Sequence, residues 1–171
     1  FLMAAVISST DAASVFSILK SKKLNLKYRS ASMLEVESGS NDPASYMLTI
    51  MALNIMQGKS QSIVLFLVKQ IGIGVVSGVL IGVAAAMILK QIRFGIEGLE
   101  TVFIVAVCIL SFNLPELFGG NGYLAVYITG FIIGNSKFEN KISLVHFFDG
   151  VTELAQMLIF FLLGLLSFPS Q

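Results

Sequence analysis

Long apolar segments separated by short polar connections make up almost the whole chain. They cover residues 1–19, 32–56, 63–89, 99–118, 123–135 and 147–168. An α-helix rises about 1.5 Å per residue, so about 20 apolar residues cross the roughly 30 Å hydrocarbon core of a bilayer. The pattern therefore predicts an all-α, polytopic membrane protein. Because the connections are short, consecutive helices should be antiparallel.

The composition agrees with this class of protein. Hydrophobic residues make up 56% of the chain and charged residues 12%, whereas soluble domains carry about 25% charged residues. The mean hydropathy is +0.87. A soluble protein with an unusually large core is the alternative, and the length of the apolar runs argues against it. The single Cys108 excludes a disulfide framework, and no polybasic or aromatic-interleaved pattern favours a nucleic-acid partner.

Basic residues are distributed unevenly between the two ends of the predicted spans. If the spans alternate in direction, nine of the eleven fall on one side, namely Lys20, Lys22, Lys23, Lys27, Arg29, Lys90, Arg93, Lys137 and Lys141. Lys59 and Lys69 lie toward the other side. The positive-inside rule makes the lysine-rich side cytoplasmic.

Small residues recur at every fourth position of the segment 63–89, namely Gly74, Gly78, Gly82 and Ala86. This spacing gives one smooth helix face that another backbone can approach closely. Gly130 and Gly134 repeat the pattern on a smaller scale. Packing within one chain is one interpretation of these faces, and a subunit interface is the other.

Polar residues interrupt the first apolar segment near its centre, where Ser8, Ser9, Thr10 and Asp11 follow seven apolar residues. Ser, Thr and Asp are strong N-cap residues, so a second half-helix is expected to begin near Ala12. Transporters use the unwound carbonyls of such broken helices to coordinate cations. We therefore predict a broken helix, the alternative being a continuous helix with Asp11 facing a neighbour.

The second segment carries two carboxylates within the heptapeptide Glu37-Ser38-Gly39-Ser40-Asn41-Asp42-Pro43. An ionised side chain at the bilayer centre costs at least about 2.5 to 3.5 kcal/mol, so such carboxylates are functional candidates. Ser38 and Asp42 share one helix face because they are four residues apart, and Glu37 pairs with Asn41 by the same spacing.

Pro43 adds a further oxygen to this segment. It has no backbone N–H to donate to the Gly39 carbonyl, which should free that oxygen and kink the helix. Carboxylate, hydroxyl and carbonyl oxygens suit a hard cation, and a carboxylate that titrates can exchange a proton for it. A purely structural role for Asp42, as a cap at a helix break, is the alternative.

Four groups of residues carry a resemblance to a known family. They are Ser9-Thr10-Asp11-Ala12-Ala13, Leu34-Glu35-Val36-Glu37-Ser38-Gly39-Ser40-Asn41-Asp42-Pro43, Gly122-Tyr123-Leu124-Ala125-Val126-Tyr127 and Phe147-Phe148-Asp149-Gly150. Together they resemble the monovalent cation:proton antiporters of the NhaP and sodium/hydrogen exchanger branch, most of all the bacterial potassium/proton antiporters. The resemblance covers nearly the whole chain.

The resemblance implies an NhaA-like antiporter fold with a broken helix. Residues 1–56 would belong to the core, or ion-translocation, domain and residues 57–145 mainly to the dimerisation side. Residues 146–171 would lead toward a second core repeat. It also implies a homodimer in the cell (inner) membrane, and we expect the chain to be an internal fragment of a longer transporter.

The resemblance also assigns roles to individual residues. Asp42 would bind proton and cation alternately, with Ser38 and the Thr10 carbonyl as further ligands of the monovalent cation. Three residues would support the site: Asp11 by balancing the helix dipoles, Asn41 by fixing the unwound segment, and Glu37 by pairing with an Arg on a later core helix. An Asn at position 41, where electrogenic relatives carry Asp, favours electroneutral exchange.

The predicted function is therefore secondary active exchange of K⁺ or Na⁺ for protons by alternating access. The protein would be a transporter and not an enzyme, with no cofactor, and with the lipid bilayer, the cation and the proton as its partners. A cation channel and a structural membrane subunit are the alternatives. An intramembrane aspartyl protease using Asp11 and Asp42 is a remote one, because its Gly-x-Gly-Asp context is absent.

Overall fold

The computed structural model describes residues 1–9, 30–58, 62–91, 98–138 and 140–167. The helices of this part are α1 (Leu2–Ile7), α3 (Ser30–Met56), α4 (Ile63–Gln91), α5 (Leu99–Leu117), α6 (Gly122–Asn135) and α7 (Lys141–Leu166). No strand occurs within these ranges. The prediction of an all-α protein is confirmed.

Three of these helices, α4, α5 and α7, are long and apolar enough to cross a membrane. Helix α6 is apolar but only 14 residues long, which corresponds to about 21 Å and is shorter than the hydrocarbon core. Helix α3 has 27 residues, but its polar heptapeptide makes it less apolar than the other long helices. The predicted spans are thus confirmed for α4, α5 and α7, whereas the predicted span of α3 stays a prediction.

The boundaries of two segments differ from the predicted ones. Helix α7 begins at Lys141, six residues before the predicted start at Phe147, because a helix continues beyond the apolar run that marks its membrane part. Helix α1 ends at Ile7, with Ser8 as its C-cap. The first half of the predicted broken helix is therefore present, and the second half, from Ala12 to Leu19, lies outside the described residues.

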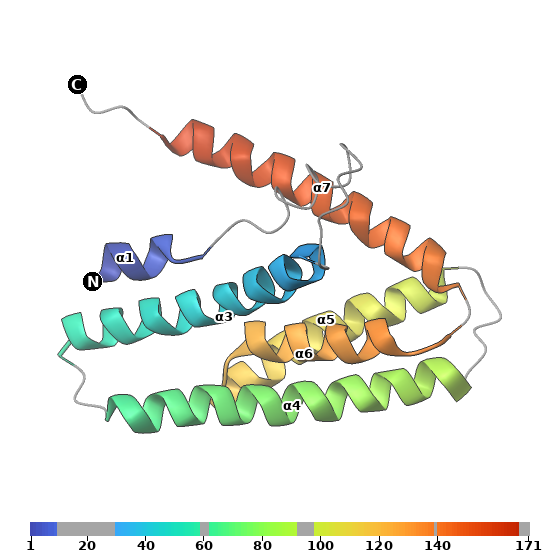
Figure 1. Cartoon of the computed structure of the whole chain (residues 1–171), viewed down its shortest axis with the longest axis horizontal. Coiled ribbons are helices and arrows are strands. Elements are labelled where there is room, and N and C mark those ends of the chain that lie inside the picture. Colours follow the sequence, from blue (N-terminus) through green and yellow to red (C-terminus); the bar gives the residue numbers. More distant parts are fainter. Residues whose placement is uncertain (10–29, 59–61, 92–97, 139, 168–171) are drawn as a thin grey trace.

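Helices α3, α4, α5 and α6 form one bundle, with α1 alongside α3, and α7 diverges from the bundle at an angle (Figure 1). Helix α6 has contacts with α3, α4 and α5, of which the contact with α4 is the most extensive. A buried apolar cluster at the far end of α4 joins four helices through Leu89, Ile104, Ile133 and Leu144. Beyond this cluster the apolar side chains of α7 are exposed.

The contact between α4 and α6 depends on the glycine face of α4. A Cβ on Gly74 would lie 2.9 Å from the Asn121 carbonyl oxygen, and one on Gly78 would lie 2.7 Å from that of Ala125. The contacting residues advance by four positions on both helices, so α4 and α6 run parallel. Helix α5, which lies between them in the sequence, runs in the opposite direction. Packing within one chain is therefore confirmed for this face, which α6 occupies.

The smaller glycine pattern has a different outcome. A Cβ on Gly130 or Gly134 would meet nothing within 4 Å, so this face of α6 has no close helix partner among the described residues. The same spacing thus marks a close helix contact on α4 but not on α6.

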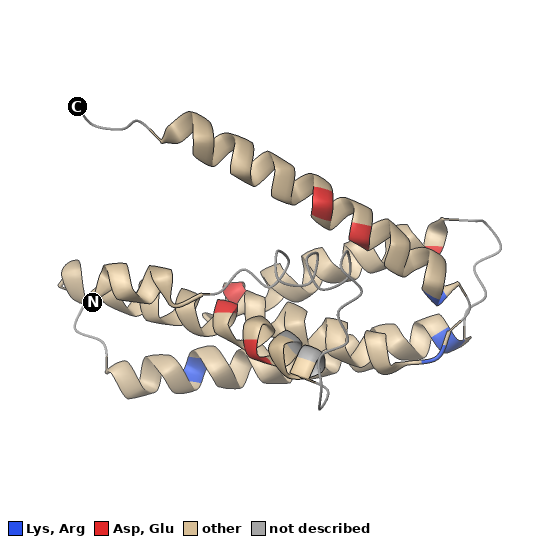
Figure 2. Cartoon of the chain, turned by 45° about the horizontal axis from the view of Figure 1, so that its top comes forward, with Lys and Arg blue, Asp and Glu red and all other residues tan. Residues whose placement is uncertain are grey.

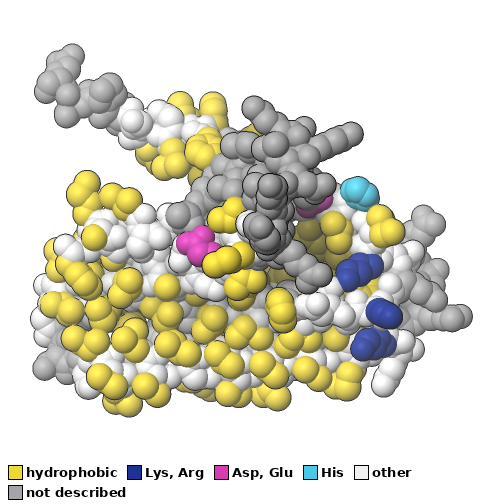
Figure 3. Space-filling view, viewed as in Figure 1, with side chains coloured by type: hydrophobic (Ala, Val, Ile, Leu, Met, Phe, Trp, Pro, Cys, Tyr) yellow, Lys and Arg dark blue, Asp and Glu magenta, His cyan; other side chains and the backbone are white. Residues whose placement is uncertain are grey.

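The exterior of the bundle is suited to lipid. Large hydrophobic side chains are exposed along α4, α5 and α7, and they cover most of the face drawn in Figure 3. Basic side chains gather mainly at one end of the bundle, whereas acidic ones lie nearer its middle (Figure 2). This distribution is typical of a multi-pass membrane protein whose charged ends face water.

Candidate cation-binding site

The polar heptapeptide of α3 lies against the end of α1. The last carbonyl groups of a helix lack backbone partners, and the Ala5 carbonyl accepts hydrogen bonds from the hydroxyls of Ser8 and Ser45, each at 2.7 Å. Ser45 is buried and belongs to α3. Its bond therefore fixes the end of α1 next to the turn of α3 that carries Asp42.

Asp42 accepts a hydrogen bond from Ser9, which directly follows the C-cap of α1. The Ser9 hydroxyl donates to Oδ1 of Asp42, and the Asp42 side chain is exposed within this chain. A carboxylate beside a hydroxyl at the end of a helix places several oxygens together, which a cation can share. The structure thus brings together the two polar motifs singled out from the sequence.

The other predicted residues of α3 all precede Asp42 on the same helix. Ser38 is only 4% exposed, as expected of a residue that faces the bundle. The Asn41 amide donates to Glu37 Oε1 at 2.6 Å, which confirms their predicted pairing. Asn41 therefore supplies a hydrogen-bond donor to one oxygen of an exposed carboxylate on its own helix.

Pro43 does not interrupt α3, which continues as one helix from Ser30 to Met56. The expected release of the Gly39 carbonyl follows from the missing N–H of Pro43, and the helix accommodates it without ending. Thr10 and Asp11, the remaining predicted site residues, lie outside the described residues.

Four residues near Asp42 were missed by sequence reasoning. Ser9 belongs to the polar interruption of the first segment and Ser45 lies just beyond the heptapeptide, but their individual partners depend on how α1 meets α3. Asn121 and Tyr127 come from the distant helix α6 and contact Pro43 and Gly39. The only local signal was that Asn121 precedes an apolar run, where Asn is a favoured N-cap.

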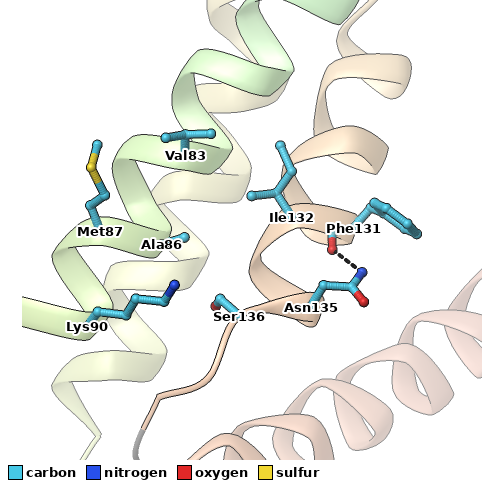
Figure 4. Close-up of a pocket in the computed structure, with 8 residues that line it drawn as sticks. All are labelled: Val83, Ala86, Met87, Lys90, Phe131, Ile132, Asn135 and Ser136. Atoms are coloured by element: carbon cyan, nitrogen blue, oxygen red, sulfur yellow. Dashed lines mark hydrogen bonds between the residues drawn. The ribbon is translucent and has the colours of Figure 1, made fainter.

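A separate cavity of about 380 Å³ lies between α4 and α6 at the lysine-rich end (Figure 4). Its walls are mainly apolar, and its polar side chains are those of Lys90, Asn135 and Ser136. The Asn135 amide is turned back to the Phe131 carbonyl of its own helix, at 2.7 Å. Without a carboxylate, this cavity lacks the exchanging group that the α3 site has.

The helical bundle, its apolar exterior and the polar residues where α1 ends against α3 define a multi-pass membrane protein with a candidate ion site. The family model described as "sodium/hydrogen exchanger, transmembrane" matches residues 1–170. The chain therefore belongs to the sodium/hydrogen exchanger family, which is a family of transporters and not of enzymes.

Curated relatives agree with this assignment. The chain is 36% identical over 173 residues to the K(+)/H(+) antiporter NhaP of Alkalimonas amylolytica, and the match covers 99% of the chain and 30% of the relative. It is 32% identical over 174 residues to the K(+)/H(+) antiporter NhaP2 of Shewanella oneidensis, with the same coverage.

The relatives are not confined to potassium exchange. The chain is also 32% identical over 184 residues to the Na(+)/H(+) antiporter NhaG of Bacillus atrophaeus, covering 96% of the chain and 33% of the relative. The chain thus spans about a third of the length of these relatives. No solved structure matches it.

Proposed function

We propose that this chain carries half of the ion site of a secondary active antiporter that exchanges a monovalent cation for protons. One observation carries the proposal: the Ser9 hydroxyl at the end of α1 donates to Asp42 Oδ1. A carboxylate and a helix break in contact are the two parts that ion exchange at membrane depth requires. The relatives NhaP and NhaG are named as cation/proton antiporters, which supports the same function.

In this proposal Asp42 binds either a proton or a cation. With the carboxylate ionised and the site empty, the Ser9 hydroxyl donates to it. When a cation enters, the hydroxyl turns so that its oxygen lone pair faces the ion, and Ser38 and the Thr10 carbonyl supply further oxygens. When a proton enters instead, the carboxyl group is neutral and the cation leaves. Each turnover therefore moves the two ions in opposite directions.

The finer parts of the proposal rest on the family. An Asn at position 41 favours one cation per proton, so transport should be electroneutral. Asp11 would balance the dipoles of the broken helix. Glu37, which accepts a hydrogen bond from Asn41, would also pair with a later Arg. Hard oxygen ligands accept both K⁺ and Na⁺, so both remain proposed substrates.

The proposed assembly is a homodimer in the cell (inner) membrane, with residues 1–56 in the core domain. Because α6 occupies the glycine face of α4, the dimer contact has to use another surface of residues 57–145. The exposed apolar residues of α4 and α5 offer such surface.

The experiment is Asp42→Asn in the complete protein, assayed in everted vesicles by dissipation of a pH gradient on addition of K⁺ or Na⁺. We expect exchange to be lost, because the amide cannot carry the proton. Glu153→Gln on α7, at an exposed carboxylate outside the motifs that carry the resemblance, is the control and should retain exchange. Retained exchange in Asp42→Asn would contradict the proposal, and so would cation currents in wild-type protein without proton coupling, which would indicate a channel.

A further inference from the structure

We propose that helix α6 positions the Asp42 segment, through the Asn121 amide and the Tyr127 ring, and thereby sets the affinity of the site for its cation. The two residues contact α3 on either side of Asp42, at Pro43 and at Gly39. This inference rests on the proposed antiport function and adds two positioning residues to it.

Asn121 is fully buried and every polar group of its side chain is used. Its Nδ2 donates to the Pro43 carbonyl at 3.1 Å, and its Oδ1 accepts from the Leu124 backbone N–H at 3.0 Å. The second bond is an N-cap of α6, and it determines which end of the amide faces α3. The orientation of the donor toward Pro43 is therefore fixed by the start of α6.

The backbone of Asn121 is fixed as well. Its N–H donates to the Gln70 carbonyl of α4 at 3.1 Å, and its carbonyl lies against Gly74. Helix α6 is thus attached to α4 at the point from which it reaches α3. A displacement of α3 relative to α4 has to break or move the bond between Asn121 and Pro43.

Tyr127 forms the second contact, one and a half turns further along α6. A Cβ on Gly39 would lie 2.4 Å from Cε2 of Tyr127, so the ring approaches α3 where only glycine leaves room. Gly39 is also the residue whose carbonyl lacks the Pro43 donor. The ring therefore restricts α3 at the turn that Pro43 makes least rigid.

Between these two contacts lies Asp42, whose carboxylate has to meet Ser9 at the end of α1. Loss of either contact lets α3 shift or tilt there, which misplaces the carboxylate relative to the other ligands. Cation binding needs several oxygens at once, whereas proton binding needs one. Mispositioning should therefore weaken the cation more than the proton.

The first test is Asn121→Ser in the complete protein. Serine keeps an N-cap hydroxyl for α6 but is too short to reach Pro43. We expect the apparent KM for the cation to rise about three- to tenfold, because a change of this size corresponds to the loss of roughly one neutral hydrogen bond. Because the proton then competes more effectively, the acid limb of the pH profile should move to higher pH by up to about one unit. The maximal rate per folded transporter should change less.

Asn135→Ser is the matched control, since this residue lies on the same helix and its amide bonds its own helix at Phe131. Its KM and pH profile should stay at wild-type values. If Asn121→Ser also left both unchanged, or lowered only the amount of folded protein, the positioning role would be overturned.

The second test uses Gly39→Ala with and without Tyr127→Ala. The added methyl group should raise the apparent KM in the presence of the Tyr127 ring and have little further effect in its absence. Equal effects of Gly39→Ala in both backgrounds would show that the ring is not what restricts α3. All variants are compared with Asp42→Asn. Exchange retained in Asp42→Asn would contradict the proposed function itself. An inactive Asp42→Asn together with an unchanged Asn121→Ser would contradict only the positioning role.

Discussion

Helix α6 meets two neighbours in two different ways. Against α4 the backbones touch along several turns, because Gly74, Gly78 and Gly82 leave no side chain between them. Against α3 the contact is made by separate side chains, chiefly the Asn121 amide and the Tyr127 ring. The first contact holds two helices as one body, whereas the second can be altered one bond at a time.

The difference fits the chemistry of the two partners. Helix α4 carries no carboxylate. A continuous contact with α6 therefore does not restrict any movement that the proposed function needs. Helix α3 carries Asp42, whose surroundings would change between proton and cation in the proposed function. Separate contacts position such a helix while leaving it able to adjust.

The largest expected effect comes from breaking the continuous contact with Gly78→Ala. The new Cβ would lie 2.7 Å from the Ala125 carbonyl oxygen and 2.9 Å from its Cα, and backbone atoms cannot move aside cheaply. Forced overpacking of this kind costs about 1–3 kcal/mol. Thermal unfolding of the detergent-solubilised protein should therefore shift to lower temperature.

Gly72→Ala on the same helix provides the control for that prediction. A Cβ there would meet nothing within 4 Å, and alanine favours a helix over glycine by up to about 1 kcal/mol. This variant should be as stable as wild type or more so. Equal destabilisation by both substitutions would mean that the close approach of α6 at Gly78 is not the cause of the loss.

Removal of the Ser45 hydroxyl should have an intermediate effect. In Ser45→Ala the Ala5 carbonyl keeps its bond from Ser8, so the loss should be about 1 kcal/mol, within the range measured for hydrogen bonds between membrane helices. Ser40→Ala is the control, because Ser40 is exposed and bonds the Val36 carbonyl of its own helix. If unfolding temperatures fell equally in both variants, the contact between α1 and α3 would not be the cause.

The sequence predicts those features of the two contacts that depend on residues close together in the chain. Periodicity identified the long helices and the glycine face, and a spacing of four residues was enough to pair Glu37 with Asn41. The sequence could not tell that Gly78 has a close partner while Gly130 has none among the described residues, because both patterns look alike until the helices pack.

The bond between Asn121 and Pro43 could not be predicted either. It joins a side chain to a carbonyl 78 residues away, and neither residue type is specific for the other. Such a bond follows from the arrangement of α3, α4 and α6, which in turn depends on the glycines. The local pattern therefore predicts the helices, and the packing determines which polar groups meet at the site.

The smallest effect is expected where the continuous contact contains a single polar bond. Thr129 is buried, and its hydroxyl donates to the Gly78 carbonyl at 3.1 Å. Thr129→Val keeps the shape of the side chain and removes the donor, and that carbonyl still has its helical partner. The cost should be about 0.6 kcal/mol, the average for such bonds in membranes, measured as a small fall in unfolding temperature. A loss as large as that of Gly78→Ala would mean that hydrogen bonding, and not backbone approach, holds α4 to α6, and the two contacts of α6 would then be of one kind.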